Sequence, residues 1–200
     1  MPKLGEEFEQ AEEAKAYEYK SMEPGAYMCK VQQVLTEGTL SRSTWTSDEK
    51  QYVMLLLDVD EGEHAGKFSD TYWDGKEYAH RLYMSWKPSA MGMLKHTFAA
   101  FKDANPGFDA RAAFEADKWD LFAGKRLLVL WNGQEYESNT GELRMSVRPD
   151  RALTAEDKPR PKVEKLDGER VDYADWQASQ VQASTSPAPA ADPYADSVPF

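Results

Sequence analysis

The sequence has a single cysteine, Cys29, so no disulfide can form within its 200 residues. A cysteine in an apolar run is typical of a small buried side chain in a reducing compartment. There is no run of about 18 apolar residues, which argues against a transmembrane helix. The acidic N-terminal stretch also lacks the apolar core of a signal peptide. These features predict a cytoplasmic protein with no membrane partner.

Sequence motifs of enzymes are missing as well, including phosphate-binding loops, dinucleotide-binding turns and the serine hydrolase elbow. His64, His80 and His96 have no metal-ligand spacing, and we expect them on the surface or on a helix face. The carboxylates of residues 58–64 lack the spacing of a calcium-binding loop. We therefore expect no enzyme activity, no catalytic residue, no cofactor and no metal site.

The acidic charge is unevenly distributed along the chain. The net charge is −11, and residues 1–24 and 150–200 each contribute −4 of it. Residues 25–149 are nearly balanced, with 15 basic against 18 acidic side chains. Phosphate binding needs Lys and Arg, and a balanced domain can still form a local basic groove.

Hydrophobic periodicity predicts five strands. Residues 26–35 and 51–61 give the first two, separated by a polar loop over residues 36–50. Alternation of apolar and polar side chains gives a third strand at residues 80–86. Two further strands flank the hairpin turn "ESNTG", and Arg144, Ser146 and Arg148 share the polar face of the last one.

A helix is predicted between the third and fourth strands. Pro88 marks its start, residues 105–107 (Asn-Pro-Gly) mark its stop, and apolar residues recur at helical spacing. A helix at this place among five strands is the connectivity of the OB-fold barrel. We expect an acidic N-terminal segment (1–24), an OB-fold domain (25–149) and a disordered linker with an acidic tip (150–200). Another small β-barrel or an α+β sandwich remains open.

Aromatic side chains beside basic ones suit a single-stranded nucleic acid, since bases stack on rings and phosphates pair with cations. Such residues occur in the first two strand connections and on the polar faces of the third and fifth strands. We predict this binding set: Arg42, Trp45, Lys50, Tyr72, Trp73, Lys76, Arg81, Tyr83, Lys87, Arg144 and Arg148. Trp86 and Trp131 are expected in the core instead.

The C-terminal "DPYADSVPF" combines Asp192 and Asp196 with Val198, Pro199 and Phe200. It resembles the acidic tip of bacterial single-stranded-DNA-binding proteins, although its acidic run is sparser. In that class the tip docks on replication, recombination and repair proteins and does not bind DNA. The resemblance implies that these five residues form a partner-binding tip.

The body of the chain, over about residues 22–149, resembles a phage-encoded family of single-stranded-DNA-binding proteins found near recombination genes. The segments "MEPGAY", "MSWKPSAMGMLKHTFAAF", "NPG", "FAGKRLLVL" and "EYESNTGELR" carry this resemblance. It implies a sequence-nonspecific protein that protects single-stranded DNA at the nucleoid of a bacterial host and recruits partners through its tip.

Two other hypotheses stay open. One is a recombination strand-annealing or nuclease-accessory protein. The other is an acidic DNA mimic, which the net charge of −11 favours. The sequence does not decide between DNA and RNA, the size of the binding site, or whether the protein forms a homo-oligomer (a dimer or larger).

Overall fold

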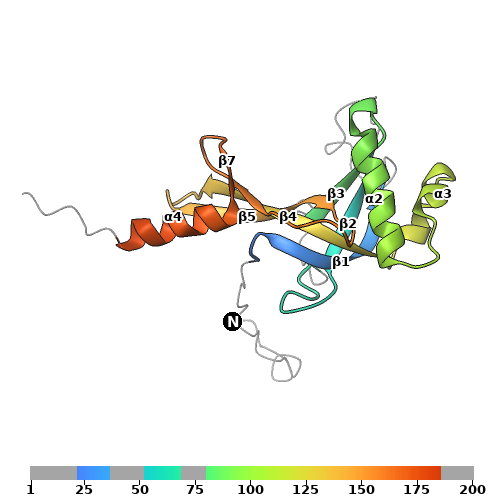
Figure 1. Ribbon diagram of the computed structural model, residues 1–200, viewed down its shortest axis with the longest axis horizontal. Helices are drawn as coiled ribbons and strands as arrows, with labels where there is room; N and C mark the ends of the chain where they lie inside the picture. Colours follow the sequence, from blue (N-terminus) through green and yellow to red (C-terminus); the bar gives the residue numbers. More distant parts are fainter. Residues whose placement is uncertain (1–21, 37–51, 69–79, 186–200) are drawn as a thin grey trace, which may run out of the picture.

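A computed structural model describes residues 22–36, 52–68 and 80–185. Within these ranges the fold is mixed α+β, with helices packed beside a seven-stranded open sheet (Figure 1). The strands are β1 (Gly25–Leu35), β2 (Tyr52–Val59), β3 (Arg81–Ser85), β4 (Arg126–Glu137), β5 (Leu143–Ala152), β6 (Lys162–Glu164) and β7 (Arg170–Asp172). The helices are η2 (Pro88–Ala90), α2 (Met91–Ala104), α3 (Ala110–Glu115), η3 (Trp119–Phe122) and α4 (Tyr173–Thr185). The expectation of a β-rich α+β fold is confirmed, but the sheet has seven strands, where the sequence predicted five.

The sheet is built around β1 and β4. β1 pairs antiparallel with both β2 and β4, and β2 pairs with β3. β5 pairs antiparallel with β4, and β6 pairs parallel with β4 before β7 closes a small hairpin. The first five strands thus follow the predicted order, with the helical segment between β3 and β4.

The main core lies between the inner face of the sheet and the helices. Alternating side chains of β1, β2 and β4 fill it, among them Cys29, Leu55 and Trp131, each 0% exposed. The predicted buried positions of Cys29 and Trp131 are confirmed, and Trp86 packs against the same core. Burial of these apolar side chains is the main favourable term that holds the sheet to the helices.

Helix α2 lies between β3 and β4 in the chain, as predicted, and covers one end of the sheet. Leu94 and Phe101 lie on its buried face, whereas Met91 is 51% exposed. Asn105 ends the helix: its Nδ2 donates to the carbonyls of Phe101 and Arg126, and its Oδ1 accepts from the Arg126 backbone N–H at 2.9 Å. The end of the helix is therefore tied to the start of β4.

The segment after β5 is ordered up to residue 185, which corrects the expectation that residues 150–200 are disordered. Leu153 and Val163 are buried (1% and 0% exposed), and β6 and β7 extend the sheet. The sequence did not reveal these strands because each has only three residues and is held by pairing, β6 with β4 and β7 with β6. Residues 186–200 lie outside the described part of the chain.

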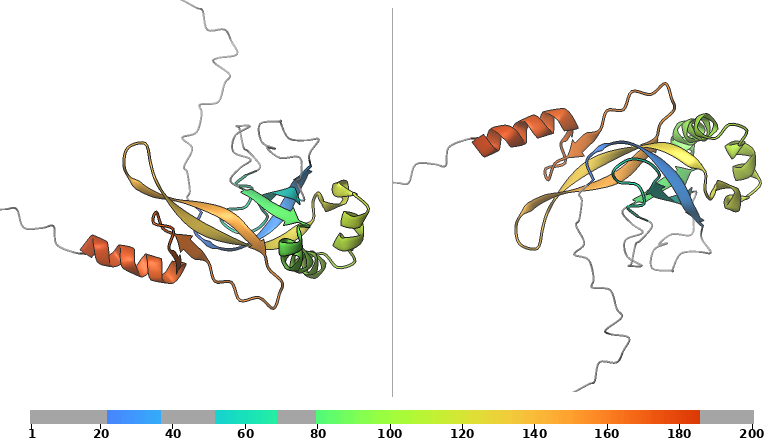
Figure 2. Two further views of the ribbon diagram at one scale, coloured as in Figure 1. Left: turned by 90° about the horizontal axis from the view of Figure 1, so that it is seen from above. Right: turned by 90° about the horizontal axis from the view of Figure 1, so that it is seen from below.

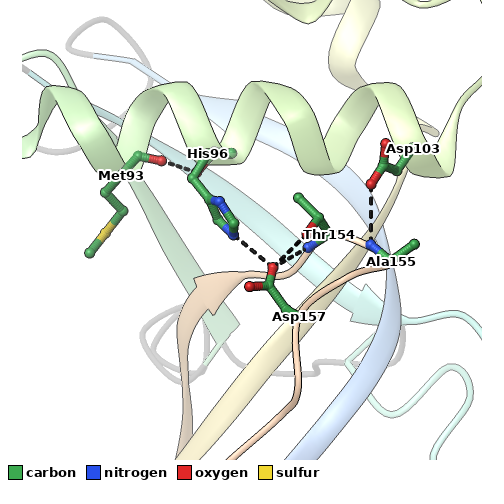
Figure 3. Close-up of polar contacts among 7 residues, drawn as sticks. Met93, His96, Asp103, Thr154, Ala155 and Asp157 are labelled. Atoms are coloured by element: carbon green, nitrogen blue, oxygen red, sulfur yellow. Dashed lines mark hydrogen bonds and ion pairs between the residues drawn. The ribbon is translucent and has the colours of Figure 1, made fainter.

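Side chains of α2 hold this segment in place (Figure 3). His96 Nε2 lies 2.9 Å from Asp157 Oδ2, and Asp103 accepts a hydrogen bond from the Ala155 backbone at 3.1 Å. Asp157 also accepts from the backbone and hydroxyl of Thr154, and these bonds, with His96, hold the pKa of its carboxyl below its usual value. The chain between β5 and β6 is thus fastened to the helix.

The molecule is elongated, with α2 and α3 at one end and the β4–β5 hairpin and α4 at the other (Figures 1 and 2). Helix α4 is anchored at its first turn, where Trp176 Nε1 donates to Glu135 Oε1 at 2.6 Å. Val181, further along, is 63% exposed. None of the described helices combines the length and apolar character needed to cross a membrane.

Candidate nucleic-acid interface

Strands β2 and β3 place two tyrosines side by side on the surface opposite the main core. The rings of Tyr52 and Tyr83 meet edge to face, with centroids 5.4 Å apart and planes at 69°. Tyr83 is 53% exposed, and its predicted place on the outward face of the third strand is confirmed. An exposed ring on a rigid strand is suited to stack a nucleobase.

Tyr52 was not among the predicted binding residues. It opposes Ser85 in the antiparallel register, and Met54 opposes Tyr83, so the tyrosines are diagonal neighbours on one face. The sequence does indicate its position, because residues 53, 55 and 57 of β2 face the main core and alternation places residue 52 on the opposite side of the strand. Burial raises the pKa of the Tyr52 hydroxyl, so the phenol is neutral at physiological pH.

Arg81 differs from its prediction. The sequence placed its guanidinium on an exposed polar face, but the side chain is only 5% exposed, with Nη1 3.9 Å from the sulfur of Met54. The outer side of β2 is apolar, and Met54 and Leu56 form a small second cluster with Leu35. Arg81 therefore lies against the apolar support of the tyrosine pair, and its direct contact with a ligand phosphate is not favoured.

Strands β4 and β5 supply the basic part of the interface. On β5, Arg144 and Arg148 are exposed and alternate with Ser146, as predicted. Arg144 Nη2 pairs with Glu142 Oε2 at 2.8 Å, which partly neutralises it. Within the described chain, the Arg148 guanidinium has no hydrogen bond or ion pair and is available to an anion.

Tyr136, which the sequence reasoning missed, lies opposite Arg144 in the register and is 42% exposed. It shares its side of β4 with Asn132 and Gln134, which oppose Arg148 and Ser146. Only the register of the hairpin brings these side chains together. The pairing repeats the combination of a ring and a guanidinium that single-strand binding requires.

We call the side of the sheet opposite the main core the outer face; it carries Tyr52, Tyr83, Asn132, Gln134, Tyr136, Arg144, Ser146 and Arg148, and also the buried Arg81. β3 and β5 contact each other, so the tyrosine pair and the arginines of β5 belong to neighbouring strands. Lys87 is exposed just beyond the end of β3, before helix η2. Of the predicted residues, Tyr83 and Lys87 therefore lie on or just after β3, and Arg144 and Arg148 lie on β5, with Arg144 near the turn of the β4–β5 hairpin.

The other predicted binding residues lie outside the described part of the chain. These are Arg42, Trp45, Lys50, Tyr72, Trp73 and Lys76, together with the tip residues Asp192, Asp196, Val198, Pro199 and Phe200. Residues 37–51 connect β1 to β2, and residues 69–79 lie between β2 and β3, so both segments border a strand of the tyrosine pair.

The buried reactive groups take part in packing. Burial raises the pKa of the Cys29 thiol to about 12 and lowers the pKa of His80 to about 4. Both groups are neutral at physiological pH, and His80 stacks on Phe68 with ring centroids 4.7 Å apart. His80 is only 1% exposed, which corrects its expected surface position. In the described ranges, no three His, Cys, Asp or Glu side chains gather as metal ligands would.

A groove of about 620 Å³ lies at the other end of the molecule, between α2 and α3. Trp86, Phe98 and Trp119 line it around the ring of Phe114. The charged side chains on its rim balance, since two basic residues, Lys95 and Arg111, face Glu115 and Asp117. This groove therefore lacks the excess of cations expected of a phosphate site.

Comparison with known proteins does not identify the chain: its sequence matches no protein-family model and no curated protein.

Proposed function

We propose that this protein binds single-stranded DNA without sequence preference and protects it during replication, recombination or repair. The observation that carries the proposal is the Tyr52–Tyr83 pair on β2 and β3, in which Tyr83 is 53% exposed, next to the strand that bears Arg144 and Arg148. Rings that stack bases and cations that pair with phosphates are the two requirements of such a site.

We further propose that β1–β5 form an OB-fold barrel. The pairings of β1 with β2 and β4, of β2 with β3 and of β4 with β5 agree with that topology, as does the helix before β4. Contact between β3 and β5 supports closure. In OB-folds the face of the second and third strands binds oligonucleotides, flanked by the 1–2 and 4–5 loops. The tyrosine pair and the β4–β5 hairpin correspond to these places.

A partner-binding role of residues 192–200 is a second part of the proposal. The exposed end of α4 is directed away from the helices α2 and α3, so the chain leaves the fold at a distance from them (Figure 1). Apolar and acidic side chains such as Asp196, Val198 and Phe200 suit a partner pocket with a basic rim. The protein would act at the nucleoid, in the cytoplasm of a bacterial host.

The test is a titration of fluorescently labelled oligo-dT and a duplex of equal length, followed by anisotropy. We expect single-stranded DNA to bind more tightly than duplex, and the affinity to fall as salt rises. Failure to bind oligo-dT at low salt would refute the proposal. It would favour the acidic DNA mimic, for which the net charge of −11 is the specific observation and a basic protein the expected ligand.

A further inference from the structure

The hairpin β6–β7 extends the sheet beyond the five strands considered so far. β6 runs parallel to β4, with Gly133 opposite Val163 and Gln134 opposite Glu164. It occupies the same edge of β4 as β1, beyond Trp131, which pairs with Gly25, the first residue of β1. The hairpin therefore continues the surface of the β4–β5 ribbon.

The alternation of side chains shows which surface this is. Val163 is 0% exposed, and a Cβ placed on Gly133 would lie 3.1 Å from its side chain, so both face the buried side. Lys162 and Glu164 consequently point to the opposite side, the side of Asn132 and Gln134. That side is the outer face, where Asn132 opposes Arg148.

A row of polar side chains thus crosses three strands. Arg148 on β5 lies opposite Asn132 on β4, and Asn132 Oδ1 accepts a hydrogen bond from the Lys162 backbone N–H on β6 at 2.9 Å. This bond ties β6 to the side chain of Asn132, so the Lys162 side chain lies beside the row. Arg148 and Lys162 therefore flank one amide on a continuous surface.

The row borders a cleft of about 240 Å³. Its lining includes Asn132, Gln134, Arg148, Lys162, Glu164 and Arg170. Arg170 is occupied, because its Nε and Nη2 both lie within 2.9 Å of Glu164 Oε2. Asp150 also lines the cleft. In the described ranges, however, the charged ends of Arg148 and Lys162 form no hydrogen bond or ion pair. Two uncommitted cations remain at the cleft.

We propose that this cleft is a second phosphate-binding site, in which Arg148 and Lys162 hold the DNA backbone after it leaves the tyrosine pair. The inference rests on the proposed function and deepens it, because the β6–β7 hairpin becomes part of the binding path. A strand would then need more nucleotides to reach Lys162 than to cover the tyrosines alone.

The experiment compares wild type with Lys162→Ala on two oligo-dT lengths, about 8 and about 25 nucleotides, chosen around the known range for one OB-fold. For the longer strand we expect roughly threefold to tenfold weaker binding, and a salt dependence of log K lower by about 0.7 in magnitude. The shorter strand should bind both proteins equally. Lys162→Arg should retain affinity, and Lys118→Ala, an exposed lysine beside η3, should change nothing.

The outcomes separate the two proposals. If wild type binds neither oligonucleotide, single-strand binding itself is wrong. If wild type binds the longer strand and Lys162→Ala binds it with the same affinity and salt dependence, the cleft is not a phosphate site, although single-strand binding stands. Thermal unfolding of Lys162→Ala at the wild-type temperature would show that any loss of affinity is not a loss of fold.

Discussion

Replacement of Tyr83 by alanine removes the most exposed ring of the proposed stacking surface. Tyr83 is 53% exposed and touches Tyr52 edge to face. A base stacked on an aromatic side chain contributes about 1–3 kcal/mol, so Tyr83→Ala should raise the Kd for oligo-dT by roughly 5- to 150-fold.

The fold should tolerate this change. An edge-to-face aromatic pair contributes about 0.5–1.5 kcal/mol beyond its buried area, and about half of the Tyr83 side chain is already exposed. The assay is anisotropy of a labelled oligo-dT at low salt, together with thermal unfolding of each variant. Tyr83→Phe keeps the ring and should bind nearly as wild type.

Two results would contradict base stacking on the Tyr83 ring. If Tyr83→Ala binds as tightly as wild type, the tyrosine pair does not stack bases. If Tyr83→Phe loses as much affinity as Tyr83→Ala, the hydroxyl rather than the ring is required.

Three further predictions concern the segments that hold the interface together. Gly133→Ala would place a Cβ 2.6 Å from Met145 Sδ and 3.1 Å from both Pro24 and Val163. In a denaturant titration this variant should lose about 1–3 kcal/mol of unfolding free energy. Gly92→Ala in α2 is the control, because its Cβ meets nothing within 4 Å and should leave the stability unchanged or raise it. The pKa of Asp157 is lowered from its usual value of 3.8, so the ionised carboxylate stabilises the folded state above pH 3.8. This contribution is lost as the pH falls through the lowered pKa of the folded protein. Asp157→Asn should therefore lose less unfolding free energy than wild type on acidification below about pH 4. Trp176→Phe removes the hydrogen bond to Glu135 and should speed amide exchange in α4 while exchange in β1 and β4 is unchanged; equal acceleration throughout would contradict local anchoring.

The described helices and strands differ in how strongly the sequence predicts them. β1 to β5 and α2 were predictable because each has a long apolar repeat and clear turn residues, such as Pro88 and the "ESNTG" hairpin. β6 and β7 were not, because three-residue strands carry no periodic signal and are ordered by pairing, β6 with β4 and β7 with β6. The order of residues 150–185 is a tertiary effect of this kind.

The candidate site was predictable only in part. Tyr83, Arg144 and Arg148 follow from strand alternation, whereas Tyr52 and Tyr136 join them only through cross-strand register. The burial of Arg81 was missed because the outer side of β2 is apolar as well as its inner side. A bulge between Val31 and Gln33 in β1 turns Leu35 to the outer side, where Leu35 packs on Met54.

Ultraviolet cross-linking of oligo-dT to the full-length protein, with the linked peptides identified by mass spectrometry, would locate the DNA-binding surface. If DNA binds the outer face, we expect cross-links at its aromatic side chains, namely Tyr52, Tyr83 and Tyr136, and their loss at high salt. Cross-links confined to the groove between α2 and α3, at Trp86, Phe98, Phe114 or Trp119, would contradict binding at the outer face.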